Sequence, residues 1–392
     1  MAEIVDHGYV SPQYWSWERY NDGSMYIKND SWNYVRKKYS DGWDWERIYD
    51  SDGNFTYTYA TVSGNGANLK GGTGNDDIWN EASKVTINGG DGNDFINNTA
   101  SNVTIAGGAG NDSIQIWYGD NLSINGGDGD DTIKNWTSSI TIDAGDGNNY
   151  VENTGYNVSI YCGWLGDNTI SNSGNKVTLT GGRENNNIYN SGSSIKISCD
   201  DGNDTVSTGG TNVKITLGSG NDNFSNTGSS VTVTGGNGKD TITNKGAKVS
   251  IHSGSEEDLI TNEGNKVTIT AWTGDDTISN TGSTVRIYCG DGKDFITSSG
   301  DSVLIKGEVG NDIIQNTGSK SSIYGGSGKD SIKNSSNNVL ISDGSGDDSI
   351  ENSGDNVLFQ YYSGNDFVTG FKSNSTLQIM NGTCHYFGRK WQ

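Results

Sequence analysis

Single apolar residues recur at a fixed interval along most of this chain, and each follows a glycine-rich hexapeptide. The cleanest copy of the pattern is Gly89-Gly90-Asp91-Gly92-Asn93-Asp94, followed by Phe95 and Ile96. Copies begin 17 times between positions 71 and 361, at steps of 18 residues apart from two steps of 19. A short fixed period that covers most of a chain predicts a solenoid.

Each 18-residue unit contains two short stretches in which apolar and polar residues alternate. In one unit the alternation directs Ile96, Val103 and Ile105 inward and directs Asn97 and Thr104 outward. Two short strands and two turns per unit give a flattened coil whose strands stack in parallel register. The sequence therefore predicts an all-β fold, a parallel β-roll or β-solenoid of about 17 coils of 18 residues each.

Three domains are expected. Residues 1–62 hold five of the 11 Trp, and their alternating aromatic and polar residues are broken by Asp-Gly turns, which predicts a small antiparallel β domain. This domain either caps the first coil or binds glycans through its aromatic side chains. Residues 63–368 are the solenoid. Residues 369–392 form either a C-terminal cap or an uncleaved export tail.

The second turn of each unit carries a polar pattern of its own. Asn recurs two residues after the inward apolar residue, so stacked coils place these amides in a hydrogen-bonded row. The members of this row are Asn80, Asn98, Asn135, Asn153, Asn172, Asn190, Asn226, Asn244, Asn262, Asn280, Asn316, Asn334 and Asn352. Gly two residues later, at Gly174, Gly192, Gly228 and Gly282, suggests a turn that needs a positive φ.

The 392 residues carry a net charge of −22, which disfavours nucleic acid and anionic lipid as partners and favours cations. The longest apolar runs are too short for membrane insertion. The start of the chain lacks the basic and apolar regions of a cleaved signal peptide, so export would use another route. Cys162, Cys199 and Cys289 share the first place of the repeat, two or more coils apart, and are expected to be free thiols.

The glycine-rich loops suit a hard cation. Three Gly allow backbone carbonyls to turn toward one point, and the sixth-place Asp adds a carboxylate. Stacked loops would then hold Ca²⁺ between them by oxygen ligands alone. The whole chain has only three His, and this scarcity argues against softer metals, which prefer His or thiolate ligands. The candidate metal ligands are Asp76, Asp94, Asp112, Asp131, Asp204, Asp222, Asp240, Asp258, Asp276, Asp294, Asp312, Asp330, Asp348 and Asp366, with Gly72, Gly74, Gly90, Gly92, Gly236, Gly238, Gly326 and Gly328.

The nonapeptide that runs from Gly89 to Asn97 resembles the haemolysin-type calcium-binding repeat of RTX proteins. The resemblance covers about three quarters of the chain and implies a β-roll with calcium between successive loops, in an exported bacterial protein. RTX repeats usually place such a loop in both halves of the coil, whereas here only alternate nonapeptides qualify. Calcium is therefore expected along one edge, with the Asn row on the other.

Three consecutive sixth-place residues are amides, namely Asn149, Asn168 and Asn186, in loops also altered by Trp164, Arg183 and Glu184. A gap in the ion row is expected there. The remaining Asp predict about a dozen ions, whose charge would roughly balance the formal −22 of the chain. Glu256 and Glu308 alter two further loops, so a dozen is an upper figure.

No catalytic motif stands out, so the chain is not expected to be an enzyme. The favoured hypothesis is a secreted or cell-surface, calcium-stabilised structural or adhesive rod that binds itself, end to end or side by side, or surface glycans. Glycan or ice binding and a calcium-folding tail of an exported toxin or enzyme are the alternatives. The outward row on the second strand includes Thr86, Thr104, Ser123, Thr141, Ser159, Thr178, Lys196 and Lys214, and it ends with Leu304, Leu340 and Leu358. These three Leu either form an exposed apolar stripe for self-association or are covered by the C-terminal tail.

Overall fold

The computed structural model describes residues 4–10, 15–20, 24–28, 33–38, 44–49, 55–62, 66, 68–380 and 385–386. The chain divides into two compact units, Met1–Gly192 (unit 1) and Ser193–Gln392 (unit 2). The described residues form strands and turns but no helix, so they include no helical segment able to cross a membrane.

Unit 1 begins with six strands in which each pairs antiparallel with the next. They are β1 (Ile4–Val10), β2 (Trp15–Tyr20), β3 (Ser24–Lys28), β4 (Asn33–Lys38), β5 (Asp44–Tyr49) and β6 (Phe55–Val62). Strand β6 also pairs in parallel with the first even-numbered solenoid strand, where Tyr59 lies opposite Asp77. The side chains of residues 1–62, on which the choice between cap and binding module depends, lie outside the described residues.

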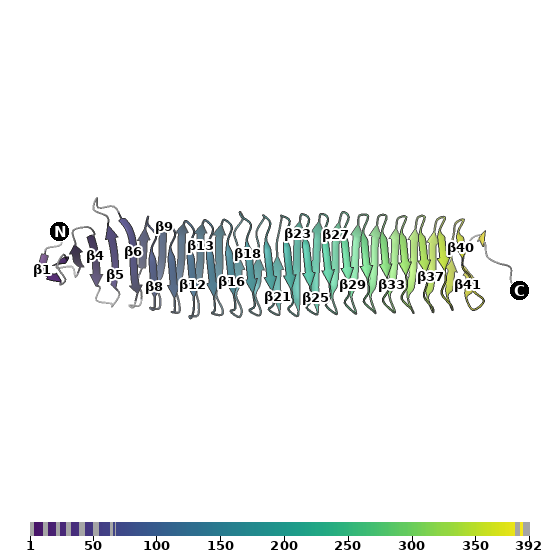
Figure 1. Cartoon of the computed structure of the whole chain (residues 1–392), viewed down its shortest axis with the longest axis horizontal. Helices are drawn as coiled ribbons and strands as arrows, with labels where there is room; N and C mark the ends of the chain where they lie inside the picture. The colour runs from purple at the N-terminus through teal and green to yellow at the C-terminus, as the bar shows by residue number, and fades with distance from the viewer. Residues whose placement is uncertain are drawn as a thin grey trace. The chain divides into compact units, whose positions relative to one another are not determined.

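The rest of unit 1 is a solenoid with two parallel sheets (Figure 1). The even-numbered sheet contains β8 (Asp77–Asn80), β10 (Phe95–Asn98), β12 (Ser113–Ile116), β14 (Thr132–Asn135), β16 (Tyr150–Asn153), β18 (Thr169–Asn172) and β20 (Asn187–Asn190). The odd-numbered sheet contains β7 (Asn68–Gly72), β9 (Thr86–Asp91), β11 (Thr104–Ala109), β13 (Ser123–Asp128), β15 (Thr141–Asp146), β17 (Ser159–Tyr161) and β19 (Thr178–Thr180).

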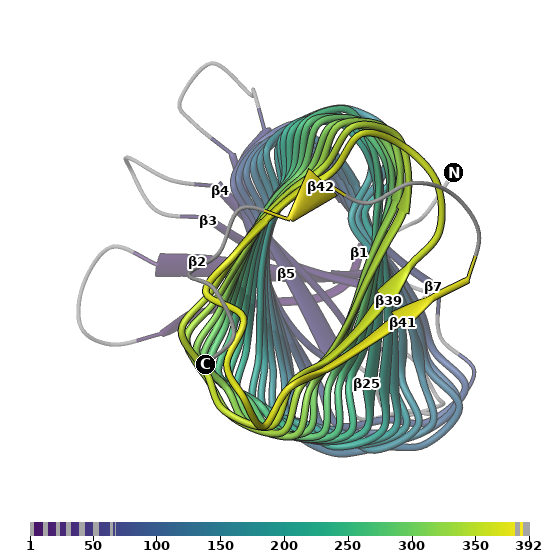
Figure 2. The same ribbon diagram turned by 90° about the vertical axis from the view of Figure 1, so that its right-hand side faces the viewer.

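Unit 2 repeats this arrangement. Its odd-numbered strands are β21 (Ile195–Ser198), β23 (Val213–Ser219), β25 (Val231–Asn237), β27 (Ser250–Ser255), β29 (Thr268–Thr273), β31 (Arg286–Asp291), β33 (Leu304–Val309), β35 (Ser322–Ser327), β37 (Leu340–Ser345), β39 (Leu358–Tyr361) and β41 (Thr376–Ile379). Its even-numbered strands are β22 (Thr205–Thr208), β24 (Asn223–Asn226), β26 (Thr241–Asn244), β28 (Leu259–Asn262), β30 (Thr277–Asn280), β32 (Phe295–Ser298), β34 (Ile313–Asn316), β36 (Ser331–Asn334), β38 (Ser349–Asn352), β40 (Phe367–Thr369) and β42 (His385–Tyr386). In the end-on view of Figure 2, β25 and β39 lie along the same side of the coil.

The predicted fold class is confirmed. Counted from β8 to β40, each of the 17 repeats supplies one even-numbered strand, and within each unit the paired strands are parallel without a register shift. Beyond these repeats, β41 pairs with β39 and β42 with β40, so the two sheets extend to Ile379 and Tyr386. Of residues 369–392, predicted as a cap or tail, 381–384 and 387–392 lie outside the described residues.

The core consists of single Ile and Val residues that alternate with outward polar residues. Ile96, Val103 and Ile105 are almost completely buried, as the alternation predicts. Each buried Ile contributes about 1.5–3 kcal/mol of transfer free energy, so the regular placement compensates for the low apolar content. Asn97 belongs to the outward row but is only 5% exposed. It lies in register between the larger Trp79 and Gln115, whose side chains flank it on the outer surface.

The row of Asn residues at the ends of the even-numbered strands is confirmed. Asn262 donates from Nδ2 to Oδ1 of Asn280 at 2.7 Å and accepts the same bond from Asn244. Its Nδ2 also donates to the Gly264 carbonyl, and its Oδ1 accepts the Gly264 N–H. This second turn is therefore held by amides without any ligand.

The glycines of the second turn have a different role from the predicted one. The positive φ falls two residues after them, for example at Lys176 with φ 55° and Ser230 with φ 57°. A Cβ on Gly174 would clash with the carbonyl oxygen of Gly155 in the preceding coil, and one on Gly228 would clash with that of Gly210. Close approach of neighbouring backbones, and not a left-handed conformation, requires Gly at these positions.

The predicted apolar stripe on the outer face of unit 2 is not continuous. Leu304, Leu340 and Leu358 are each half-buried, and Ser322 lies in register between Leu304 and Leu340. Leu340 and Leu358 are direct neighbours, followed by Thr376. The surface offers a pair of adjacent leucines instead of a three-residue patch.

Candidate metal centre

The sixth-place Asp residues line the inside of the glycine-rich turns. Each lies directly before an even-numbered strand, as Asp94 does before β10 and Asp240 before β26. All 14 predicted Asp ligands are buried, with 0 to 2% of their surface exposed. The Asp row and the Asn row therefore lie at opposite ends of the even-numbered strands, as the sequence predicts.

One oxygen of each carboxylate is fixed by the neighbouring coil. The backbone N–H of Asp94 donates to Oδ1 of Asp112 at 2.7 Å, and that of Asp330 donates to Oδ1 of Asp348 at 2.7 Å. The same bond recurs between successive coils within both units. These bonds hold the carboxylates in a regular row whether or not a ligand is present.

The second oxygen of these carboxylates is buried without a hydrogen-bond donor. Within the described part of the chain, Oδ2 accepts no hydrogen bond in Asp94, Asp112, Asp131, Asp222, Asp240, Asp276, Asp294, Asp312, Asp330, Asp348 and Asp366. A buried carboxylate oxygen with no partner is costly, and a regular series of them requires an explanation. In Asp258 the Ser253 hydroxyl offers a partner.

A backbone carbonyl from the next coil lies close to this second oxygen. The first-place residue drops out of the strand pairing: Ala106 and Gly108 pair with β9, whereas Gly107 between them does not. A Cβ built on Gly89 would clash with both Oδ2 of Asp94 and the carbonyl oxygen of Gly107. The same convergence is found around Gly235, where Oδ2 of Asp240 and the Ser253 carbonyl would meet the added Cβ. Two acceptors from adjacent coils thus share one small space.

The three Asn loops show what that space requires. Asn149 donates from Nδ2 to the carbonyls of Gly145 at 3.0 Å and Gly147 at 3.1 Å, the second and fourth places of its own loop. Asn168 donates to the Gly166 carbonyl at 2.9 Å and to the first-place carbonyl of the next coil, Gly181, at 3.2 Å.

Asn186 follows the same rule. Its Nδ2 donates to the Gly182 carbonyl at 3.4 Å and the Glu184 carbonyl at 2.6 Å. In these three loops the amide donates to backbone carbonyls, whereas in the Asp loops a carboxylate oxygen lies beside the first-place carbonyl of the next coil. In the Asp loops the same places hold acceptors only.

We use the term oxygen cage for the four acceptors of one Asp loop: Oδ2 of the sixth-place Asp, the first-place carbonyl of the next coil, and the second- and fourth-place carbonyls of the same loop.

The oxygen cage fits a positively charged occupant. Burial raises the pKa of Asp94 and Asp240 to about 7 and that of Asp276 to about 8, because desolvation disfavours the charged form. Hydrogen bonds from the preceding coil oppose the rise, and neighbouring carboxylates add to it. A proton or a hard cation relieves this cost, and an all-oxygen ligand set matches Ca²⁺.

The predicted glycine ligands occupy the second and fourth places of the loops. Six of them have left-handed φ values between 118° and 136°: Gly90, Gly92, Gly236, Gly238, Gly326 and Gly328. Gly72 and Gly74 present their carbonyls to the positions where Gly90 and Gly92 would carry a Cβ.

Glu256 and Glu308 stand where other loops have Gly and also have positive φ, at 76° and 78°. A left-handed conformation costs a non-glycine residue roughly 1 kcal/mol. These two residues therefore keep the left-handed conformation of their loops at the cost of added strain.

The first place of each loop points into the interior. Cys162, Cys199 and Cys289 occupy it as free, fully buried thiols, as the sequence predicts. Cys384 lies outside the described residues.

The contribution of the first-place carbonyl was not predictable from the sequence, because any residue type supplies a carbonyl and only the stacking reveals its direction.

No family model and no curated protein matches the chain. Among solved structures, the chain is similar to a hyperactive, Ca²⁺-dependent, β-helical antifreeze protein from an Antarctic bacterium. The identity is 17%, the TM-score is 0.27, and the match covers 80% of this chain and 92% of that protein. At this level of similarity the calcium dependence and the antifreeze activity are statements about that protein alone.

Proposed function

We propose that this chain is an exported structural or adhesive β-solenoid of the RTX type that binds Ca²⁺ in the oxygen cages and depends on it to remain wound. The observation that carries the proposal is the contrast between Asn and Asp loops. Asn168 donates its own N–H groups to the Gly166 and Gly181 carbonyls, whereas Asp94 places a further acceptor beside the Gly107 carbonyl, the equivalent of Gly181. A cation supplies the missing positive charge.

The number of ions follows from the row of acids. Each cage contains one sixth-place Asp, so the four acids from Asp76 to Asp131 and the ten from Asp204 to Asp366 give at most 14 cages, close to the dozen ions expected. Full occupancy by about a dozen Ca²⁺ would offset the net charge of −22. The amide loops at Asn149, Asn168 and Asn186 are expected to hold no ion.

The low negative charge of the ligands in each cage favours a function outside the cell. One carboxylate oxygen and several carbonyls per ion give a weak site, and sites of low ligand charge bind Ca²⁺ in the range of about 10⁻⁴–10⁻³ M, typical of extracellular modules. An exported protein meets such calcium concentrations. Self-association and surface glycans remain the expected partners, and no catalytic role is proposed.

Circular dichroism, small-angle scattering and elemental analysis test this function together. In millimolar calcium the chain should be compact, rich in parallel β structure, and carry about a dozen ions. Addition of a chelator at pH 8 should expand it and reduce the β signal. A chain that keeps the same size and spectrum with calcium below one ion per molecule would remove calcium from its function.

Ice binding is a second candidate, supported by one surface of unit 1. Its odd-numbered strands carry exposed hydroxyls in register, at Thr86, Thr104, Ser123, Thr141, Ser159 and Thr178. Spacing of about 4.8 Å between coils makes this row regular enough to order water. Recrystallisation assays of the full chain and of the Thr141→Lys variant test it: activity that this variant abolishes supports ice binding, and inactivity of the unaltered chain excludes it.

A further inference from the structure

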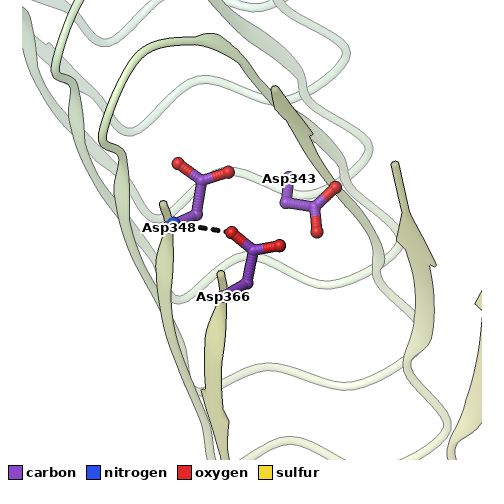
Figure 3. A group of neighbouring side chains, drawn as sticks. All are labelled: Asp343, Asp348 and Asp366. Atoms are coloured by element: carbon purple, nitrogen blue, oxygen red, sulfur yellow. Dashed lines mark hydrogen bonds between the residues drawn. The ribbon is translucent and has the colours of Figure 1, made fainter. Parts of the chain in front are cut away.

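One coil of unit 2 carries an additional carboxylate inside the turn. Asp343 occupies the first place of its loop, where the other 16 copies have Gly, Ala, Cys, Ser, Leu or Tyr. Carboxylate oxygens of Asp343, Asp348 and Asp366 all lie within 4.8 Å of one another (Figure 3). Asp343 comes from β37, whereas Asp348 and Asp366 directly precede β38 and β40. The three acids therefore converge from two sheets.

All three side chains are buried, with 1 to 2% of their surface exposed. Asp366 accepts the N–H of Asp348 on Oδ1 at 2.7 Å, drawn as the dashed line in Figure 3. Asp343 accepts the N–H of Gly344 at 2.6 Å and that of Tyr362 at 3.1 Å on its own Oδ1. Oδ2 of Asp348 and Oδ2 of Asp366 accept no hydrogen bond from the described residues. Two buried, unpartnered oxygens thus face a third carboxylate.

No basic side chain balances this group among the described residues. Lys329, in the loop of the preceding coil, pairs instead with the exposed Asp347. Burial raises the pKa of Asp348 to about 7 and that of Asp343 to about 6, chiefly through desolvation. Three carboxylates without a counter-ion inside a turn are strongly destabilising, because each loses its hydration without gaining a partner.

We propose that Asp343, Asp348 and Asp366 form a distinct site that binds one divalent cation of the calcium type more tightly than the repeated oxygen cages do. The repeated cages bring one carboxylate oxygen against carbonyls, whereas this site brings three carboxylates together. Ligand charge is a main determinant of Ca²⁺ affinity, so the site retains its ion when the others have lost theirs. The proposal extends the proposed function, since Asp348 and Asp366 also belong to the row, but Asp343 has no counterpart in it.

Elemental analysis of the full chain after graded chelation tests this site. The calcium-loaded chain is dialysed against a series of calcium buffers of decreasing free concentration, and the bound calcium is counted at each step. About one ion per chain should persist at free calcium about tenfold below the level that empties the rest. In Asp343→Asn this last ion should leave together with the others. Asp343→Gly, which restores the commonest first-place residue, provides a second variant, and Asp347→Asn is the matched exposed control.

Each outcome has a distinct meaning. Simultaneous loss of all ions from the unaltered chain, unchanged in Asp343→Asn, overturns the tight site and leaves the cages intact. A single retained ion with no others at millimolar calcium supports the tight site and overturns the row of cages. Loss of the tight ion in Asp347→Asn as well would show a general charge effect and contradict the assignment to Asp343. Circular dichroism in calcium verifies that the variants are folded.

Discussion

The backbone N–H of Asp222 donates to Oδ1 of Asp240 at 2.9 Å, while Oδ2 of Asp240 points toward the Ser253 carbonyl of the next coil. The two oxygens of one carboxylate thus have separate roles. The first belongs to the ladder that stacks the coils, and the second is buried with no donor. Replacing the carboxylate by an amide therefore changes the second role and preserves the first.

Asp240→Asn should stabilise the calcium-free chain and remove one ion from the loaded chain. The amide keeps Oδ1 in the ladder and gives the loop carbonyls a donor, as Asn149 does. Satisfying a buried acceptor is worth about 1–3 kcal/mol. Urea denaturation in chelator and ion counting in calcium measure the two effects. Asp291→Asn, an exposed third-place acid with the same charge change, should alter neither.

Asn168→Asp is the reverse exchange and should have the opposite result. The variant loses the Nδ2 donor to Gly166 and Gly181 and places a carboxylate oxygen against their carbonyls. In chelator it should unfold more readily by about 1–3 kcal/mol. In millimolar calcium it should recover stability and bind one additional ion, measured by the same two methods. An unchanged ion count would show that the amide loops lack a cage for other reasons.

The stability of the calcium-free chain should rise as the pH falls. Folding raises the pKa of Asp312 to about 7 and that of Asp276 to about 8, compared with about 3.9 in an unfolded chain. The folded state therefore binds these protons more tightly, so its stability is greatest below about pH 4 and is lost as the pH rises through 7 to 8.

Calcium should reverse this dependence between pH 5 and 8, because acid displaces the ion from the carboxylates. Urea midpoints at unit intervals of pH, with calcium and with chelator, give both curves. Parallel curves would indicate that protons and calcium do not compete for the same oxygens. Asn loops offer an internal reference, since they do not titrate.

Asn262→Ala should destabilise the chain equally with and without calcium. The side chain is fully buried and makes four hydrogen bonds, to Gly264, Asn280 and Asn244. Removal leaves buried donors and acceptors unpaired, at a cost of about 2–3 kcal/mol. Asn265 lies exposed in the same turn, so Asn265→Ala supplies a milder comparison. A calcium-dependent cost for Asn262→Ala would imply that the two turns of a coil are coupled.

The period of the sequence was sufficient to predict the coil, the burial of Ile96 and Ile105, and the opposite placement of the Asp and Asn rows. What it did not predict depends on contacts between coils. The requirement for Gly174 comes from a carbonyl 19 residues earlier, and the inward turn of the Gly107 carbonyl is visible only as a gap in strand pairing. The acid at Asp343 was visible in the sequence as the one charged first-place residue, but its meaning required the geometry of Asp348 and Asp366.

Thiol reactivity should report whether calcium keeps the coils wound. Cys199 and Cys289 lie at the first place of their loops, fully buried, and desolvation followed by nearby carboxylates raises the pKa of each thiol well above its usual value. In calcium both should resist alkylation at pH 8, because the thiolate is the reactive species. Under the same conditions, removal of calcium by a chelator should make both thiols accessible to the alkylating reagent. Mass spectrometry of labelled peptides identifies each modified Cys. Rapid labelling in saturating calcium would mean that the loops open without losing their ions, and that the cages do not hold the coils together.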